Sequence, residues 1–279
     1  MDTNSTFDQT TIATAPRTMW PVRGSAWLGG FGNILAKELR DWFGTRRWWL
    51  QALIWLLIFN GLLAVALNVI PQSGPVDARS GEGLFRTAVA EFLRTTALLG
   101  SIGIIVLSQD EIIQEKQSGT LAWILSKPVS RMSLILSKLI ANTLGGLIFI
   151  IALPSLVAYV ELWLASGIAA PIGPYLLALS VLLLTLIFYI TLSLMLGVIF
   201  DQRGPVLAGT LGVLIGGIIV SQFVPKLGYI LPLTMDRAAI TLLQQQPLPP
   251  ALGFELISAG LFSLLFLVAA LWKFEEAEL

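Results

Sequence analysis

The sequence contains no cysteine and no histidine among its 279 residues. Their absence excludes disulfide bonds, thiolate nucleophiles, imidazole bases and the usual ligands of zinc, copper and haem. Charged residues are scarce, at 12% against roughly 25% in an ordinary soluble domain. Lysine plus arginine balances aspartate plus glutamate at 17 each, so the excess of positive charge that attracts nucleic acid is missing. We therefore expect no nucleic-acid partner, no metal site, no cofactor and no catalytic residues.

What the chain has instead is apolar sequence. Hydrophobic residues make up 56% of it, and the mean hydropathy is +0.81. This composition predicts an all-α integral membrane protein. A helix that crosses ~30 Å of hydrocarbon needs ~20 mostly apolar residues. Six runs meet this requirement, at about residues 48–70, 88–107, 132–160, 174–200, 205–224 and 251–272.

We expect one membrane domain over residues 31–273, between a disordered tail at 1–30 and an acidic tail at 274–279. The first residues lack the basic start and short apolar core of a signal peptide. Lysine and arginine are concentrated in the connections on one side of the spans, and such sides are usually cytoplasmic. The sequence therefore predicts a multi-pass protein of the plasma or inner membrane with both termini in the cytoplasm.

The segment before the first span, residues 33–45, predicts an amphipathic elbow helix. Apolar residues recur there every three to four positions. Charged residues fall mostly on the opposite side, namely Lys37, Glu38, Arg40 and Asp41. This pattern is typical of a helix lying in the plane of the membrane interface. The alternative is an ordinary basic flank of the first span.

The connection between the second and third spans, residues 109–131, predicts a short charged helix followed by a break. Glu111, Glu115 and Lys116 suit the helix, Gly119 suits the break, and Pro128 starts a turn before the next span. A charged helix held against the cytosolic face could dock another protein. The alternative is a solvated loop.

The same connection resembles a known family. Residues 115–131 read Glu-Lys-Gln-Ser-Gly-Thr-Leu-Ala-Trp-Ile-Leu-Ser-Lys-Pro-Val-Ser-Arg, and Leu-Ser-Lys-Leu follows at 136–139. This run is similar to the signature of type-2 permeases of ATP-binding-cassette (ABC) transporters, and closest to the branch labelled copper-enzyme-maturation permeases. Ser137 stands where many relatives have glycine. The resemblance extends to the elbow helix and the six-span layout over most of residues 30–273.

The resemblance implies a permease subunit, mostly an exporter in this family, that forms the translocation path as a dimer with a second copy or a paralogue. It also implies two copies of a separate cytosolic ABC ATPase, which would bind a coupling helix at about residues 110–117. The residues that carry over to this coupling site are Asp110, Glu111, Gln114, Glu115, Gln117, Gly119, Thr120, Pro128, Ser130 and Arg131. The sequence has no Gly-Lys pair and hence no phosphate-binding P-loop, so ATP hydrolysis is expected in another chain.

Charges and glycines within the spans suggest a pathway or an outer gate. Glu91 and Arg94 are spaced to pair with each other, or else face a cavity between protomers. Gly212 and Gly216 allow close helix packing, within one protomer or at a dimer seam or moving gate. The proline-broken segment 224–250, which includes Pro232, could form short helices over the external mouth or an amphipathic surface loop.

The scarcity of charge within the spans and the absence of cysteine and histidine limit which substrates the protein could transport. The middle of the membrane has almost no fixed charge, which favours a lipid-like, amphipathic or apolar substrate over a bare ion. Copper as cargo is not supported, because cysteine and histidine are absent and the five methionines are scattered. The competing function is a non-transporting membrane scaffold that docks a cytosolic protein through the same loop. An intramembrane enzyme is disfavoured, because no acid pair lies at the midplane.

Overall fold

A computed structural model describes residues 29–44, 46–74, 80–118, 130–224 and 234–276, and all statements on structure concern these residues. In this part of the chain the secondary structure is helical throughout, without strands. The helices are α1 (Phe31–Phe43), α2 (Arg47–Ser73), α3 (Gly81–Ser108), α4 (Glu111–Gln117), α6 (Arg131–Gly145), the π-helical η3 (Gly146–Ala152), α7 (Leu153–Ser166), α8 (Ile172–Ile199), α9 (Arg203–Phe223), α11 (Met235–Leu243) and α12 (Pro250–Glu276).

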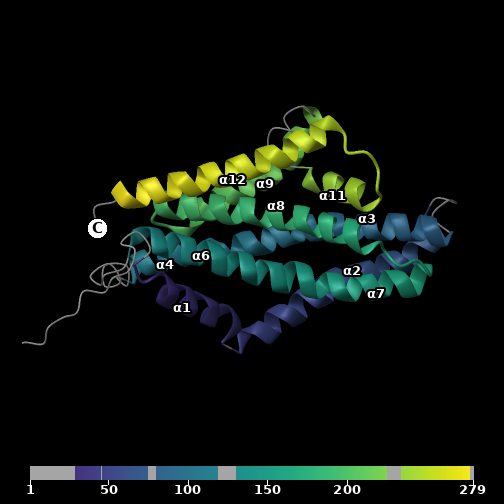
Figure 1. The fold of residues 1–279 in the computed structure, drawn as a ribbon, viewed down its shortest axis with the longest axis horizontal. Coiled ribbons are helices and arrows are strands. Elements are labelled where there is room, and N and C mark those ends of the chain that lie inside the picture. The colour runs from purple at the N-terminus through teal and green to yellow at the C-terminus, as the bar shows by residue number, and fades with distance from the viewer. Residues whose placement is uncertain (1–28, 45, 75–79, 119–129, 225–233, 277–279) are drawn as a thin grey trace, which may run out of the picture.

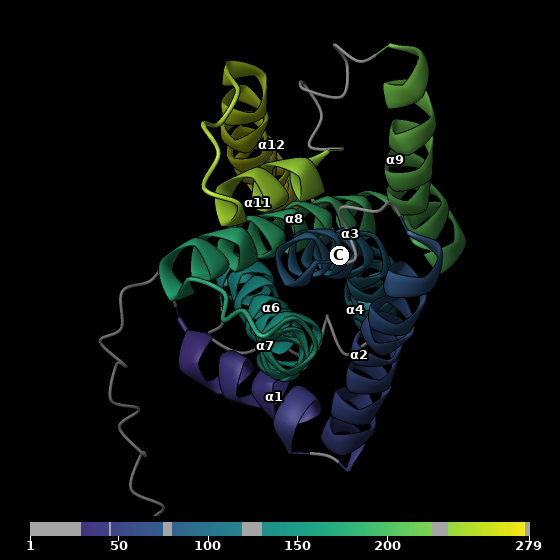
Figure 2. The same ribbon diagram turned by 90° about the vertical axis from the view of Figure 1, so that its right-hand side faces the viewer.

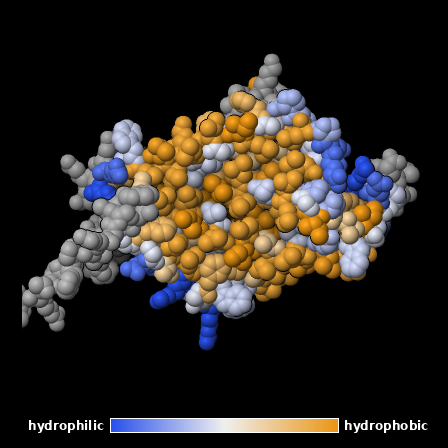
Figure 3. Space-filling model, in the orientation of Figure 1, coloured by the Kyte–Doolittle hydropathy of each residue, from blue (hydrophilic) through white to orange (hydrophobic). Residues whose placement is uncertain are grey.

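The six predicted spans are confirmed by length and hydropathy. The helices able to cross a membrane cover Trp48–Gln72, Gly81–Gln117, Arg131–Ser166, Ile172–Ile199, Arg203–Phe223 and Pro250–Glu275. They run roughly parallel to the long axis of the molecule (Figure 1). An apolar belt covers the middle of the visible surface, and the hydrophilic residues gather toward its two ends (Figure 3). This distribution is that of a protein whose solvent is the bilayer.

Short polar side chains and one glycine fix several helix boundaries. Ser80 accepts a hydrogen bond from the Gly83 backbone N–H at 3.1 Å and starts α3. Ser130 accepts one from the Ser133 N–H at 3.1 Å and starts α6. At the other end of the third span, Gly167 has φ 74°, a left-handed conformation that ends α7.

Helix α8 is the centre of the bundle. It packs against α3, α6, α9, α11 and α12, and it is the most buried of the six spans. Seen end-on, α3 and α8 lie in the middle, while α9 and α12 stand apart from each other on one side (Figure 2). Helices α2, α9 and α12 leave broad apolar faces exposed, and these faces must meet lipid or another protein.

Both described ends of the chain lie at the same end of the bundle as α4. The Ser130 backbone N–H donates to the Gly29 carbonyl at 3.1 Å. The Arg131 guanidinium donates to the carbonyls of Phe274 and Glu275 at 2.9 and 2.8 Å. We call this the α4 end and the opposite one the α11 end. The assignment of the α4 end to the cytoplasm stays a prediction.

Candidate functional site

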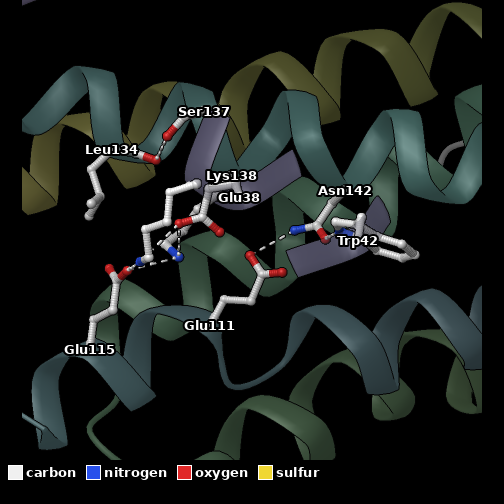
Figure 4. A network of polar contacts seen from close by, with 9 residues as sticks. Glu38, Trp42, Glu111, Glu115, Leu134, Ser137, Lys138 and Asn142 are labelled. Carbon is white, nitrogen blue, oxygen red and sulfur yellow. Dashed lines mark hydrogen bonds and ion pairs between the residues drawn. The ribbon is translucent and has the colours of Figure 1, made fainter. Parts of the chain in front are cut away.

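Five charged side chains from three helices meet at the α4 end, and Glu38, Glu111, Glu115 and Lys138 among them are labelled in Figure 4. We call them the charged cluster: Lys37 and Glu38 of α1, Glu111 and Glu115 of α4, and Lys138 of α6. The Lys138 side chain is only 3% exposed. Its Nζ lies 3.1 Å from Glu38 Oε1 and 3.3 Å from Glu115 Oε1. One buried ammonium group therefore joins the elbow helix, α4 and the start of the third span.

Lys37 pairs with the same two carboxylates from the solvent side. Its Nζ is 2.9 Å from Glu115 Oε1 and 3.4 Å from Glu38 Oε1. Burial by itself lowers the pKa of Lys37, but the hydrogen bond and charge of Glu115, with the charge of Glu38, outweigh it, so the pKa is raised. A raised pKa keeps this pairing intact below the ordinary value of 10.5, and the pairing is lost only as the pH rises further.

A second set of hydrogen bonds extends the cluster along α6. Asn142 donates from Nδ2 to Glu111 Oε2 at 2.7 Å and accepts from Trp42 Nε1 at 3.1 Å. The Trp42 ring stacks on Phe149 with centroids 6.0 Å apart. It also lies so close to Gly145 that a Cβ there would be 2.3 Å from the ring. Glycine at 145 is thus required for α1 to approach the third span this closely.

The other side of α4 is bonded to the α8–α9 turn. Lys116 Nζ donates to the Val198 and Phe200 carbonyls at 2.8 and 3.2 Å and pairs with Asp201 Oδ1 at 3.0 Å. Gln117 Nε2 donates to the Asp201 carbonyl at 3.1 Å. Another ion pair, between Arg203 and Asp110, measures 3.2 Å. The buried Ile112 and Ile113 add apolar anchorage.

Two expectations about the charged residues change. The sequence pattern puts Glu38 on the polar side of the elbow helix, whereas the structure buries it at 6% exposure. Glu111 and Glu115 were expected among the residues that face a partner, but their carboxylates point into the protein toward Asn142 and Lys138. The reason is that Glu38 and Glu115 are paired with lysines of α1 and α6, and Glu111 accepts a hydrogen bond from Asn142. Burial of a carboxylate without such partners would be far more costly.

Ten other predicted site residues fall into three groups, and those near the α11 end are described below. Gln114 and Gln117 are exposed on α4, and Arg40 and Asp41 are exposed on α1. Ser130 and Arg131 fix the start of α6 rather than an outward surface. The others lie outside the described residues: Gly119, Thr120, Pro128 and Pro232.

Sequence reasoning did not include Trp42, Lys138 and Asn142 in the site. A signal was present, because Glu111 and Glu115 are four residues apart and so are Lys138 and Asn142. Residues at this spacing share one face of a helix. Two polar pairs at the same spacing, on helices that border one connection, are a pattern expected of facing helices.

The α11 end contains the Glu91–Arg94 pair and lies beside the α9 glycines that the sequence suggested as part of a pathway or outer gate. Arg94 pairs with Glu91 at 2.6 Å, as their spacing predicts. Arg94 also lines a cavity of about 260 Å³ formed by residues of this chain, while a cavity between protomers stays a prediction. A Cβ at Gly212 or Gly216 would find no atom of the described residues within 4 Å. These glycines therefore do not serve packing within the described part of the protomer.

A short helix, α11, occupies part of the segment expected to form either helices or a surface loop. Its Met235, Ala238, Ala239 and Leu243 side chains are buried. The N–H and hydroxyl groups of Thr234, which precedes α11, donate to the fully buried Glu255 carboxylate at 2.6 and 2.7 Å. Glu255 thus ties α11 to α12, a role that the sequence did not reveal.

Comparison with known proteins identifies a family. A family model described as ABC-2 family transporter protein matches residues 32–279. No curated protein matches the chain. The matched region includes both the charged cluster and the α11-end cavity.

Proposed function

This chain belongs to the ABC-2 transporter family, and from that premise we propose that it forms one half of a dimeric exporter driven by a separate cytosolic ATPase. Membership makes it a membrane-spanning permease subunit of an ABC transporter. The export direction, the second permease copy or paralogue, the two ATPase copies and the copper-enzyme-maturation branch belong to the proposal, as does a cytoplasmic α4 end in the plasma or inner membrane.

The observation that carries this proposal is the set of contacts around α4. Ion pairs and hydrogen bonds connect this seven-residue helix to α1, α6, the end of α8 and the start of α9. Force applied to α4 would therefore reach the elbow helix and three spans directly. A permease without an ATP site of its own needs such an element, because its conformational change depends on a partner's binding energy.

The exposed side of α4 is the surface available for that partner. Gln114 and Gln117 face outward on the helix, next to Ser118, while the acidic side chains face inward. We assign the ATPase contact to Gln114 in particular, since its side chain is exposed and makes no hydrogen bond within the described residues.

A dimer is supported by α9. The small residues Ala208, Gly212 and Gly216 follow one another at four-residue spacing on its less buried side, with the exposed Ile215 and Ile219 beside them. Small residues at this spacing let two membrane helices approach closely. We assign this face to the seam between the two permease copies.

The test of the proposal is purification of the tagged full-length chain from its native membrane in mild detergent. We expect a soluble ATPase to co-purify and to hydrolyse ATP. Gln114→Arg should lower the recovered ATPase about tenfold, because it buries a charge at the contact. The matched control is Arg86→Gln, at the α11 end, which should leave recovery unchanged.

Two results would contradict the proposal. If Gln114→Arg retains the ATPase in full, the contact does not lie on α4. If no nucleotide-hydrolysing protein co-purifies in several detergents and in nanodiscs, the scaffold function replaces the permease function for this chain.

A further inference from the structure

The cavity at the α11 end lies between four helices. Its lining residues come from α3, α8, α9 and α11. In the end-on view, α9 and α11 lie on the same side of α3 and α8 (Figure 2). Its volume of about 260 Å³ leaves room for a small polar group together with part of an alkyl chain.

Polar and apolar residues divide this cavity by depth. Arg94, Asp236 and Arg237 line it near the α11 end, where α11 begins. Ser101 lies seven residues further along α3 than Arg94, which is about 10 Å deeper at 1.5 Å per residue. Between these levels the wall is mainly apolar and includes Leu98, Leu214 and Ile218. The cavity therefore has a charged rim and an apolar wall, with the hydroxyl-bearing Ser101, Thr185 and Tyr189 at its deeper part.

The positive charge available at the rim is that of Arg237. Arg94 is already bonded to Glu91 at 2.6 Å and lies 3.6 Å from Asp236. Arg237, by contrast, makes no ion pair with any described residue, and it is exposed. Deeper in the cavity, the Tyr189 hydroxyl has no hydrogen-bond partner within the described part of the chain, although the residue is only 1% exposed. Both groups can donate hydrogen bonds to an acceptor. The Arg237 charge also acts on the buried Glu255 carboxylate, but without a direct ion-pair contact between them, so its guanidinium donors are not occupied by a described residue.

We propose that this cavity binds an anionic amphiphile, with its headgroup at Arg237 and its alkyl chain along Leu98, Leu214 and Ile218. A guanidinium group prefers carboxylates and phosphates, which it binds with charge-assisted hydrogen bonds. The apolar wall favours an attached chain over a small free anion. As the place where cargo binds, the site rests on the proposed transport function, but binding itself can be tested on the permease alone.

The experiment measures binding of decyl phosphate to the detergent-purified full-length chain by native mass spectrometry. Decyltrimethylammonium serves as a probe of equal chain length and opposite charge, and inorganic phosphate as the anion without a chain. We expect decyl phosphate to bind and the other two probes to bind at least about tenfold more weakly. This comparison separates a lipid-like ligand from a free anion.

Two variants locate the site. Arg237→Gln should weaken decyl phosphate binding about tenfold, because it removes the charged donor and keeps the shape of the side chain. Arg86→Gln is the matched control, since Arg86 lies on α3 at the same end, pairs with Glu82 at 2.6 Å and does not line the cavity. Its affinity should stay within about twofold of the original. Ala97 lines the cavity, so the larger side chain of Ala97→Phe would occupy its space and should also abolish binding.

The inference is overturned if Arg237→Gln and Ala97→Phe both bind decyl phosphate as the original chain does. It is also overturned if decyltrimethylammonium binds equally well, or if inorganic phosphate displaces decyl phosphate at equal concentration. Loss of ATPase co-purification with binding intact would refute the proposed function and leave this site standing. If the ATPase co-purifies but decyl phosphate does not bind specifically, the proposed function stands and this binding site is refuted.

Discussion

At the scale of single residues, Lys138 is the side chain on which the α4 end depends. It is nearly fully buried and faces carboxylates from two other helices. A buried ion pair is stable only while its partners remain, because desolvation has already removed the energy of hydration. Lys138 therefore specifies how three helices fit together more than it adds net stability.

We expect Lys138→Met to lower the free energy of unfolding by about 3–5 kcal/mol, because it leaves Glu38 and Glu115 buried without their main counter-charge. Thermal unfolding of the purified chain measures this loss. Adding Glu38→Gln and Glu115→Gln to Lys138→Met should restore part of it, since no buried charge is then left uncompensated. Equal stability of Lys138→Met and the original chain would show that the cluster is not formed.

The burial of single side chains is also what the sequence predicts least well. Lys37 and Glu38 are neighbours in the chain, yet the Lys37 side chain is half exposed and that of Glu38 is almost fully buried. Their difference comes from Lys138, 100 residues away. Helical spacing groups residues by face, but it does not tell which face another segment will cover.

At the scale of elements, the sequence predicts the helices well. Each span is long and continuous in hydropathy, and hydrocarbon admits only helices or closed barrels, so the six spans follow from composition and length. A helix is observed at Phe31–Phe43 where the sequence predicts one at 33–45, and its place in the membrane interface stays a prediction. The π-helical segment Gly146–Ala152 was not predicted, because its wider turn leaves no mark in an apolar sequence.

Helix orientation about its own axis could not be predicted from the sequence. Inside a membrane the lipid-facing and protein-facing sides of a helix are equally apolar. Helix α9 illustrates this. A Cβ at Gly209 would lie 2.9 Å from the Leu196 side chain, whereas a Cβ at Gly212 or Gly216 would meet nothing in the part of the chain that the structure describes. All three are the same residue type in the same span.

For α9 we expect Gly212→Leu to weaken self-association of the permease about tenfold, because a bulky side chain keeps two facing helices apart. The fold of each copy should be unaffected, since there is open space at this position. Gly145→Leu is the contrasting variant and should destabilise each copy, because its side chain would collide with Trp42. Light scattering in detergent reports the first effect and thermal unfolding the second. Unfolding of single copies by Gly212→Leu would place this face inside the protomer.

At the scale of the whole molecule, the two ends of the bundle carry different chemistry. The α4 end holds a network of ion pairs that joins α4 to its neighbours, and the α11 end holds a cavity with a charged rim. Helices α3, α8 and α9 reach both ends. A displacement of α4 is thus connected to the cavity by continuous helices, which is the arrangement that coupling of ATP hydrolysis to transport requires.

The most direct test of this coupling is a site-specific crosslink, which the chain permits because it has no native cysteine. A photocrosslinker attached to Gln114→Cys, on the exposed side of α4, should form an adduct with the ATPase in native membranes. The same crosslinker on Ile219→Cys, on the apolar face of α9, should form none with it. A crosslink to the ATPase from position 219 and none from position 114 would contradict the assignment of α4 as the coupling helix.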